Sequence, residues 1–414
     1  MFRFVKILPL VALVALPAAA QIQVPPAPPV DALIAEALAK APALAAAHSR
    51  LAAVREMETP ASALDNPMVE AMVQNADFPN YTIGTEDMSM AGFEVSQPLP
   101  YPGKRRARAE SARADTVLRE TEIVDLERRI ASEVRSLYAR LYAADRERQS
   151  LTAARELVEL LSATASARYA TGGAEQESLL KAQLQVTRLE EQLDDLEADR
   201  RALVAELNRW LDRPGATPLG EIAGLPAVEA PAGSWEDRAV EASPKVRVAR
   251  AAVAAGERRL AVARLDLKPD LTPAAGYALR GALGPVLTLR VGVELPFWKS
   301  RKQEPLIRAA EAELEMARQE VRDAESMARA EAARFQAEWG KAERQIVRYR
   351  EGILPQTSTA LDAARSSYLA GRGDFSTLVE DFNLWLEARV QLARREADRF
   401  TAWAGLEALT GGQP

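Results

Sequence analysis

The chain of 414 residues contains an internal duplication, which limits its possible folds more than any other feature. Four landmarks recur in the same order about 200 residues later, and they are Pro42 with Pro244, Pro67 with Pro269, Pro98 with Pro296, and Tyr169 with Tyr368. This spacing is far longer than the period of about 20–50 residues of a solenoid, so it indicates two tandem copies of one large unit. We place the first unit at 31–212 and the second at 235–414, with a linker rich in proline and glycine at 213–234.

Each unit contains two long helical patterns, at about 102–170 and 173–212 in the first and about 300–369 and 374–410 in the second. No glycine or proline interrupts the chain between Gly103 and Gly172, and apolar residues recur there at helical spacing. At 1.5 Å per residue, such a helix would extend roughly 100 Å. In the second unit, Gly352 and Pro355 predict a kink or an unwound turn near Pro355. The helices alone are equally compatible with a coiled-coil scaffold.

Four stretches alternate between apolar and polar residues, at about 67–77, 88–98, 270–281 and 285–296. Each has about the length of a tilted membrane strand, which is 9–11 residues. A single half-buried strand of a soluble sheet would give the same pattern, but four of them favour a barrel with lipid outside and water inside. We expect these residues to face the lumen: Met68, Glu70, Met72, Met88, Met90, Glu94, Arg280, Arg290 and Glu294.

Four strands cannot close a barrel with an open lumen, so the chain must oligomerise to cover its sheet edges in hydrocarbon. A proline-aromatic corner and a group of cations follow the second strand of each unit. We expect aromatic residues there at the membrane interface and cations near anionic lipid head groups, although solvated charges are an alternative. The residues of this expected interface belt are Tyr101, Lys104, Arg105, Arg106, Phe297, Trp298, Lys299 and Arg301.

The first 20 residues have the pattern of a secretory signal, with two cations, an apolar run and small residues before an expected cut ahead of Gln21. A proline-rich linker is expected at 21–30. The chain has no cysteine, which excludes disulfides, thiolate metal sites and lipid attachment through cysteine. Its net charge of −6 argues against a nucleic-acid partner, and a single histidine, His48, leaves little basis for an enzyme. No cofactor and no metal site are expected.

Taken together, the sequence resembles the TolC-like outer-membrane efflux factors. The similarity rests on VSQPLPYPGKRR after the second strand, VELPFW after the fourth, ILPQ in a long helix, and the paired turns RYATGG and SYLAGRGDF. The resemblance implies a homotrimer with a 12-stranded β-barrel continuous with a 12-helix periplasmic tunnel. It also implies a passive exit duct in the outer membrane with a large periplasmic extension, coupled through a periplasmic adaptor to an inner-membrane transporter.

The resemblance also implies roles for the two helix reversals. The adaptor-docking tips would be Arg168, Tyr169 and Gly172 in the first unit and Tyr368, Gly371 and Asp374 in the second. Family members narrow the tunnel with acidic residues just beyond the tips. The corresponding positions here are Thr377, Glu380, the adjacent Asp381, and Ser178 in the first unit. Thr377 and Ser178 depart from the family pattern.

The stretch SMAGFEVSQPLPYPGKR is similar to the CusC and CzcC-like branch, which serves heavy-metal exporters. Methionines on the expected lumen side would suit soft ions, although methionine is also a common packing residue. We therefore favour metal-cation export over two alternatives, a drug or small-molecule duct and a type I secretion duct. An alternative of another class is a periplasmic coiled-coil adaptor or scaffold protein.

Overall fold

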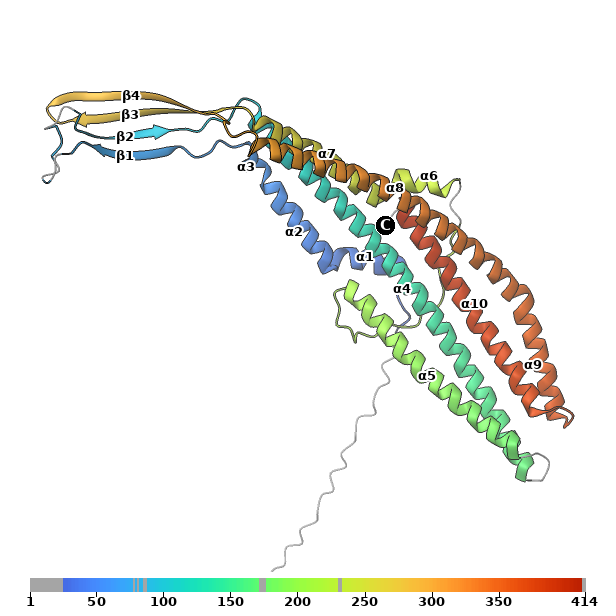
Figure 1. The fold of residues 1–414 in the computed structure, drawn as a ribbon. Coiled ribbons are helices and arrows are strands. Elements are labelled where there is room, and N and C mark those ends of the chain that lie inside the picture. Colours follow the sequence, from blue (N-terminus) through green and yellow to red (C-terminus); the bar gives the residue numbers. More distant parts are fainter. Residues whose placement is uncertain are drawn as a thin grey trace, which may run out of the picture.

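The computed structural model of the chain describes residues 25–76, 79, 82–84, 88–170, 176–229 and 233–411. The expected signal at 1–20, its cut before Gln21 and the start of the linker at 21–30 lie outside these ranges. The described chain is elongated, with a small sheet at one end and two helical hairpin tips at the other (Figure 1). The expected fold class, mostly helical with a small β part, is confirmed.

Both units run through short helices, two strands and long helical arms. The first contains α1 (Val30–Lys40), α2 (Pro42–Glu56), α3 (Glu58–Ser62), β1 (Met68–Gln74), β2 (Met90–Ser96), α4 (Lys104–Ala170) and α5 (Gln176–Trp210). The second contains α6 (Trp235–Ala242), α7 (Pro244–Leu265), β3 (Asp270–Arg280), β4 (Leu283–Glu294), α8 (Gln303–Arg348), a π-helix (Tyr349–Ile353), α9 (Leu354–Leu369) and α10 (Phe375–Thr410). Pro42 and Pro244 both occupy the first position of a helix, where the missing N–H has no cost.

The arm of the second unit contains a π-helix where the sequence predicts a kink. It ends two residues before Pro355, whose ring cannot accommodate an ordinary helical turn preceding it. The landmarks fit this interpretation. Pro98 and Pro296 are 198 residues apart, whereas Tyr169 and Tyr368, beyond the π-helix, are 199 apart. A π-turn accommodates one additional residue in a helix, so it explains the change in spacing.

The predicted seam of α4 is buried over its central part. Ile130, Val134, Leu137 and Leu141 are at most 1% exposed and pack with α1, with the end of α5 and with Phe400 of α10. Nearer the tips, a second cluster joins α4, α5, α9 and α10 around Phe375, Leu378 and Phe382. The helices therefore pack laterally along the rod, and the core is a series of clusters along its length.

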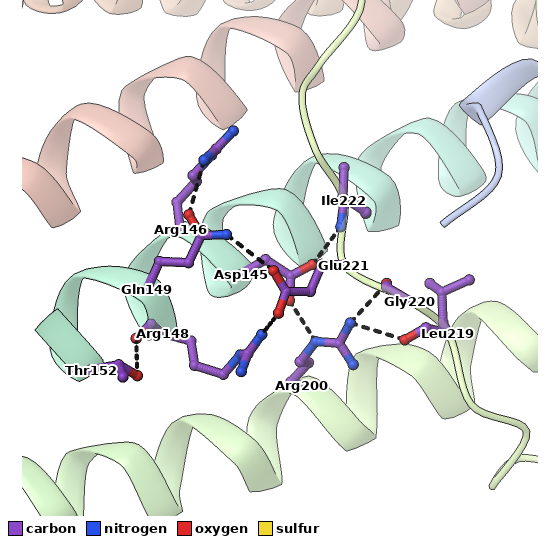
Figure 2. Close-up of polar contacts among 10 residues, drawn as sticks. All are labelled: Asp145, Arg146, Arg148, Gln149, Thr152, Arg200, Leu219, Gly220, Glu221 and Ile222. Atoms are coloured by element: carbon purple, nitrogen blue, oxygen red, sulfur yellow. Dashed lines mark hydrogen bonds and ion pairs between the residues drawn. The ribbon is translucent and has the colours of Figure 1, made fainter. Parts of the chain in front are cut away.

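The linker between the units is fixed to the first unit by a buried ion pair. Asp145 of α4 is fully buried, and its Oδ1 accepts a hydrogen bond from Arg200 Nε of α5 at 2.7 Å. Its Oδ2 accepts a hydrogen bond from the backbone N–H of Ile222 in the linker at 2.9 Å (Figure 2). The Arg200 Nη2 also donates to two linker carbonyls, those of Leu219 at 3.1 Å and Gly220 at 3.0 Å. The linker thus completes the hydrogen bonding of the pair and also covers it.

Further polar contacts surround this pair. Glu221 accepts hydrogen bonds from Arg148 and from Gln149 of α4 (Figure 2). Arg146 donates to the Ala223 carbonyl. The hydrogen bond from Gln149 and the nearby arginines lower the pKa of Glu221. The linker therefore stays attached to α4 by several charged contacts as well as by burial of Ile222.

Candidate functional site

The sheet has the strand order β1-β2-β3-β4, with every neighbouring pair antiparallel. Its register aligns the polar residues in rows across one face. One row contains Glu70, Glu94, Gly276 and Thr288, and the next contains Met68, Ser96, Ala274 and Arg290. Arg290 Nη2 reaches diagonally over β3 and donates to Glu94 Oε2 at 2.7 Å. The small residues of β3 leave room for this ion pair.

Most residues expected to face the lumen share this polar face. By register they are Met68, Glu70, Met72, Met90, Glu94, Arg290 and Glu294. Met88 lies in the turn before β2, so the expectation of a strand position for it is wrong. Arg280 ends β3 after a register shift that follows Ala278. The pattern therefore places the face correctly in the middle of the strands and less well at their ends.

The opposite face of the sheet is apolar and exposed. On the inner strand β2, Phe93 and Val95 of this apolar face are 52% and 40% exposed, whereas Met90 and Glu94 on the polar face are 9% and 7% exposed. A sheet packed on a soluble core would show the reverse distribution, with its apolar face covered. The arrangement is the one that a strand needs between lipid and an aqueous interior.

The corner after β2 differs from the expected interface belt at Lys104. The Lys104 side chain is 5% exposed, and its Nζ donates to Asp270 Oδ2 and to the Lys268 carbonyl, both at 2.9 Å. The nearby Asp270 also accepts a hydrogen bond from the Tyr101 N–H at 2.7 Å. An ammonium so enclosed cannot contact lipid head groups, so that expectation is wrong for Lys104. A carboxylate from the second unit stabilises this cation at the helix N-terminus.

The other residues of the expected belt are on the surface. Arg105 donates to the Ser62 carbonyl, and Arg106 pairs with Glu110 one turn later. Phe297 and Trp298 are 80% and 73% exposed. Lys299 and Arg301 are exposed in a turn that precedes α8, because this helix begins at Gln303 and not at about 300 as predicted.

The two tips of the arms lie side by side at the far end of the molecule (Figure 1). In the first, Tyr169 is 46% exposed, while Gly172 and the side chain of Arg168 lie outside the described residues. In the second, Gly371 has a φ of 73° and Asp374 is the exposed N-cap residue of α10. Tyr368 is only 4% exposed and packs edge-on against the Phe375 ring, with centroids 5.4 Å apart. It therefore belongs to the core under the tip, and the expectation that it forms a docking surface is wrong.

The expected gate residues lie on the two helices that leave the tips. Thr377 and Glu380 are exposed on α10, whereas Asp381 on α10 and Ser178 on α5 are half-buried. Two contacts that the sequence did not predict join these helices. Lys181 Nζ donates to Ser376 Oγ at 2.7 Å, and the buried Gln185 donates to Asn383 Oδ1 at 3.0 Å. No repeat spacing indicates these pairs, because their members are 195 and 198 residues apart and not the 199 that relates the two tips.

Comparison with known proteins decides the family. The family model described as "Outer membrane efflux protein" matches residues 33–211 and 235–412, which together make up most of the chain. The chain belongs to the outer membrane efflux protein family. It is therefore an outer-membrane efflux channel with a large periplasmic part, and not an enzyme or a periplasmic adaptor. Among curated proteins, none matches the sequence.

Solved channel structures share the fold of this family member at low sequence identity. VceC from Vibrio cholerae is 18% identical with a TM-score of 0.78, over 92% of this chain and 96% of its own. OprN is 17% identical with a TM-score of 0.81, over 93% and 90%. CusC is 17% identical with a TM-score of 0.77, over 93% and 92%. The similarity to these three channels is nearly equal, so it does not distinguish between cargoes.

None of the helices in the described ranges combines the length and apolarity needed to span a bilayer. Within those same ranges, no group of three or more histidine, cysteine, aspartate or glutamate residues is arranged to hold a metal ion.

Proposed function

We propose that three copies of this chain form the exit duct of a tripartite pump, with a periplasmic adaptor at the helical tips and an inner-membrane transporter reached through that adaptor. One observation carries this proposal. The sheet has an exposed apolar face, and β1 and β4 are its edge strands. An open edge is not tolerated in hydrocarbon, because its backbone groups find no water there. Pairing of β4 with β1 of the next copy would remove both edges.

Disulfide cross-linking tests this assembly directly, because the chain has no cysteine of its own. We would introduce one cysteine on β1, at Val69, and one on β4, at Val291. Oxidation in outer-membrane preparations is expected to give covalent trimers. A control pair on the inner strands, at Phe93 and Leu279, should form no cross-links between chains. Cross-linked dimers without trimers, or no products at all for a scan along β1 and β4, would contradict the proposal.

Within this duct, we favour metal cations as the cargo. The observation in favour is that Met68, Met72 and Met90 share the polar face of the sheet with Glu70 and Glu94. Thioethers bind soft ions such as Cu(I) and Ag(I), and carboxylates attract cations in general. Three copies would line the lumen with nine such thioethers.

Cargo can be tested in a deletion strain that carries the gene on a plasmid. Replacement of Met68, Met72 and Met90 with leucine is expected to reduce tolerance to silver and copper while leaving tolerance to drugs unchanged. Leucine keeps the volume and apolarity of methionine but lacks the sulfur. Met316→Leu with Met327→Leu, on exposed positions of α8, is the matched control. Normal metal tolerance in the triple variant, or loss of drug tolerance in the deletion strain, would favour the small-molecule alternative.

The remaining roles follow from the same assembly. We propose that Tyr169, Gly172, Gly371 and Asp374, with Arg168, form the adaptor-facing surface. We propose that Glu380 and Asp381, with Thr377 and Ser178, surround the periplasmic entrance. Tyr101, Phe297 and Trp298, with the exposed cations Arg105, Arg106, Lys299 and Arg301, would lie at the inner surface of the outer membrane.

A further inference from the structure

A cavity lies where α10 ends and α7 begins, between the long helices α4 and α8. Arg128 and Ser132 of α4 line it on one side, and Glu331 and Phe335 of α8 on the other. The start of α7, at Ser243, and the end of α10 meet at this cavity. At Gly405 the backbone of α10 approaches the Phe335 ring so closely that an added Cβ would lie 2.3 Å from it. The helices are therefore closely packed around the cavity.

Two polar groups at this cavity have no hydrogen-bond partner. The hydroxyl of Ser243 is unpaired, although the residue is only 1% exposed. The Nη1 of Arg128 is also buried and unpaired. Buried donors are almost always paired in folded proteins, so each unpaired one calls for a specific explanation. Both groups can donate a hydrogen bond, which indicates a missing acceptor.

The electrostatics at this point favour an anion. Ser243 is the N-cap residue of α7, a helix of 22 residues, but its side chain makes no capping hydrogen bond. Helix N-termini attract negative charge. Burial and the nearby Arg247 both lower the pKa of Arg128, whereas the neighbouring charges of Asp125, Glu127 and Glu407 raise it. Arg247 is therefore a second guanidinium close to Arg128.

Acidic groups also line the cavity, and their arrangement matters. Glu331 lies 3.5 Å from Lys245, so these two charges offset each other. Burial raises the pKa of Asp125, and its carboxylate acts on Arg128 as a neighbouring charge. Glu133 is exposed, and Glu407 acts on Arg128 only as a neighbouring charge. None of these carboxylates is paired with Arg128 Nη1 or with the Ser243 hydroxyl.

We propose that this cavity binds a small oxyanion, of the size and charge of inorganic phosphate or sulfate, between the Arg128 guanidinium and the Ser243 hydroxyl. The anion accepts hydrogen bonds from both groups and lies at the positive end of α7. It offsets the repulsion between Arg128 and Arg247. By contacting α4 and α7 at the end of α10, the anion holds together the helices that meet at this cavity.

The test uses the full chain, purified in detergent in a chloride buffer. Phosphate is titrated at constant ionic strength, and the thermal midpoint of unfolding is followed. A saturable increase is expected for the unmodified protein. Arg128→Gln should weaken the apparent affinity for phosphate about tenfold or more, because a charge-assisted hydrogen bond is lost. Ser243→Ala should weaken it to a smaller extent. Arg140→Gln, the same charge change elsewhere on α4, should leave it unchanged.

Isothermal titration calorimetry with inorganic phosphate and with glycerol 3-phosphate distinguishes the source of the anion. Binding of inorganic phosphate supports a free ion, and binding of the ester alone supports a phosphorylated metabolite or head group. If Arg128→Gln does not fold, Ser243→Ala alone decides. The proposal is overturned if the unmodified protein shows no saturable response, or if Arg128→Gln and Ser243→Ala respond as it does. The cavity would then hold only water.

Discussion

The two units contain the same ion pair in two different environments. The quartet Glu-Ala-Asp-Arg occurs at 197–200 and again at 396–399, which makes Arg200 and Arg399 equivalent. The spacing of 198 residues that holds before the π-helix relates Asp145 to Glu343. Arg200 and Asp145 are 2.7 Å apart, with side chains 15% and 0% exposed. Arg399 and Glu343 are 3.1 Å apart, with side chains 28% and 47% exposed.

The difference between these pairs comes from the linker and not from the pairs themselves. In the first unit the linker donates to Asp145 and accepts from Arg200, so the pair is enclosed. In the second unit Glu343 remains half exposed. A duplicated fold can therefore retain a contact in both units although the contact contributes differently to stability in each. In the first unit the pair determines where the linker lies, whereas in the second it only joins α8 to α10.

The largest effect is expected at Asp145. Removing one partner of a buried pair leaves the other charge uncompensated, which typically costs about 3–5 kcal/mol. Asp145→Ala should therefore lower the free energy of unfolding by about that amount, because Arg200 would lose its carboxylate and the linker its anchor. Glu343→Ala should cost only about 0–1 kcal/mol, as exposed pairs do. Denaturant titration of both variants in the same detergent, at equal protein concentration, measures the difference.

Limited proteolysis provides an independent measurement. Asp145→Ala is expected to expose the linker around 219–223 to cleavage, and Glu343→Ala should leave the cleavage pattern unchanged. Equal destabilisation by the two substitutions would show that burial by the linker contributes nothing. The two ion pairs would then be equivalent in sequence and also in their contribution to stability.

The second largest effect concerns the corners after β2 and β4. Lys104 is buried against Asp270, whereas its counterpart 198 residues later in the second unit, Lys302, is exposed. Lys104→Ala should destabilise the protein by about 2–3 kcal/mol, since Asp270 is partly accessible to water and can recover some hydration. Lys302→Ala should change stability by less than about 0.5 kcal/mol. Thermal midpoints in detergent separate the two cases, and similar midpoints would contradict our interpretation of the corner.

The sequence predicted the features that depend on a repeat or on an alternation of apolar and polar residues. The duplication, the faces of the strands and the seam at Ile130 and Leu137 follow from spacing alone, because period and burial are directly linked. The predictions for Lys104 and Tyr368 were wrong. Lys104 follows a proline-glycine corner and Tyr368 precedes a glycine turn, so neither lies within a periodic pattern that would indicate its burial. Their partners, Asp270 and Phe375, come from another strand or from beyond the turn.

The buried pair was missed, and the π-helix was predicted only as a kink or an unwound turn near Pro355, although the sequence contains a signal for each. The repeated quartet Glu-Ala-Asp-Arg marks Arg200, but which carboxylate it meets depends on how α4 and α5 pack side by side. The change in spacing from 198 to 199 residues indicates one additional residue between the corner and the tip. It does not indicate whether a loop or a π-turn accommodates that residue. Such choices depend on tertiary packing, which a single sequence does not contain.

A moderate effect is expected at the tip of the second unit. Gly371 has a φ of 73°, where a β-branched residue is strained by about 1–2 kcal/mol. Gly371→Val should therefore distort this turn and reduce export, while insertion and trimer formation are retained. Gly172→Val should do the same at the first tip if both tips contact the adaptor.

Gly224→Val is the control, because an added side chain in this linker position meets nothing within 4 Å. Export assays with each variant, alongside trimer yield on gels, measure the effect; normal export by both tip variants would show that the adaptor docks elsewhere.

The smallest effect is expected for the carboxylates near the entrance, where the two units differ in charge. The positions that correspond to Glu380 and Asp381 in the first unit are Lys181 and Ala182, 199 residues earlier. Three copies of the second unit would bring these carboxylates to one axis and attract cations there. Replacement of Glu380 and Asp381 with their amides should weaken this attraction by about 0.5–1 kcal/mol, as for exposed charges, which corresponds to about a two- to fivefold loss of cation preference. Single-channel recordings in a salt gradient measure that preference, and block by multivalent cations from the periplasmic side should weaken in parallel. Lys181→Gln, which removes a cation at the equivalent position, should change the preference in the opposite direction or not at all. If the double amide variant keeps both the selectivity and the block, Glu380 and Asp381 face solvent outside the tunnel. The difference in charge between the two units would then have no effect on the entrance.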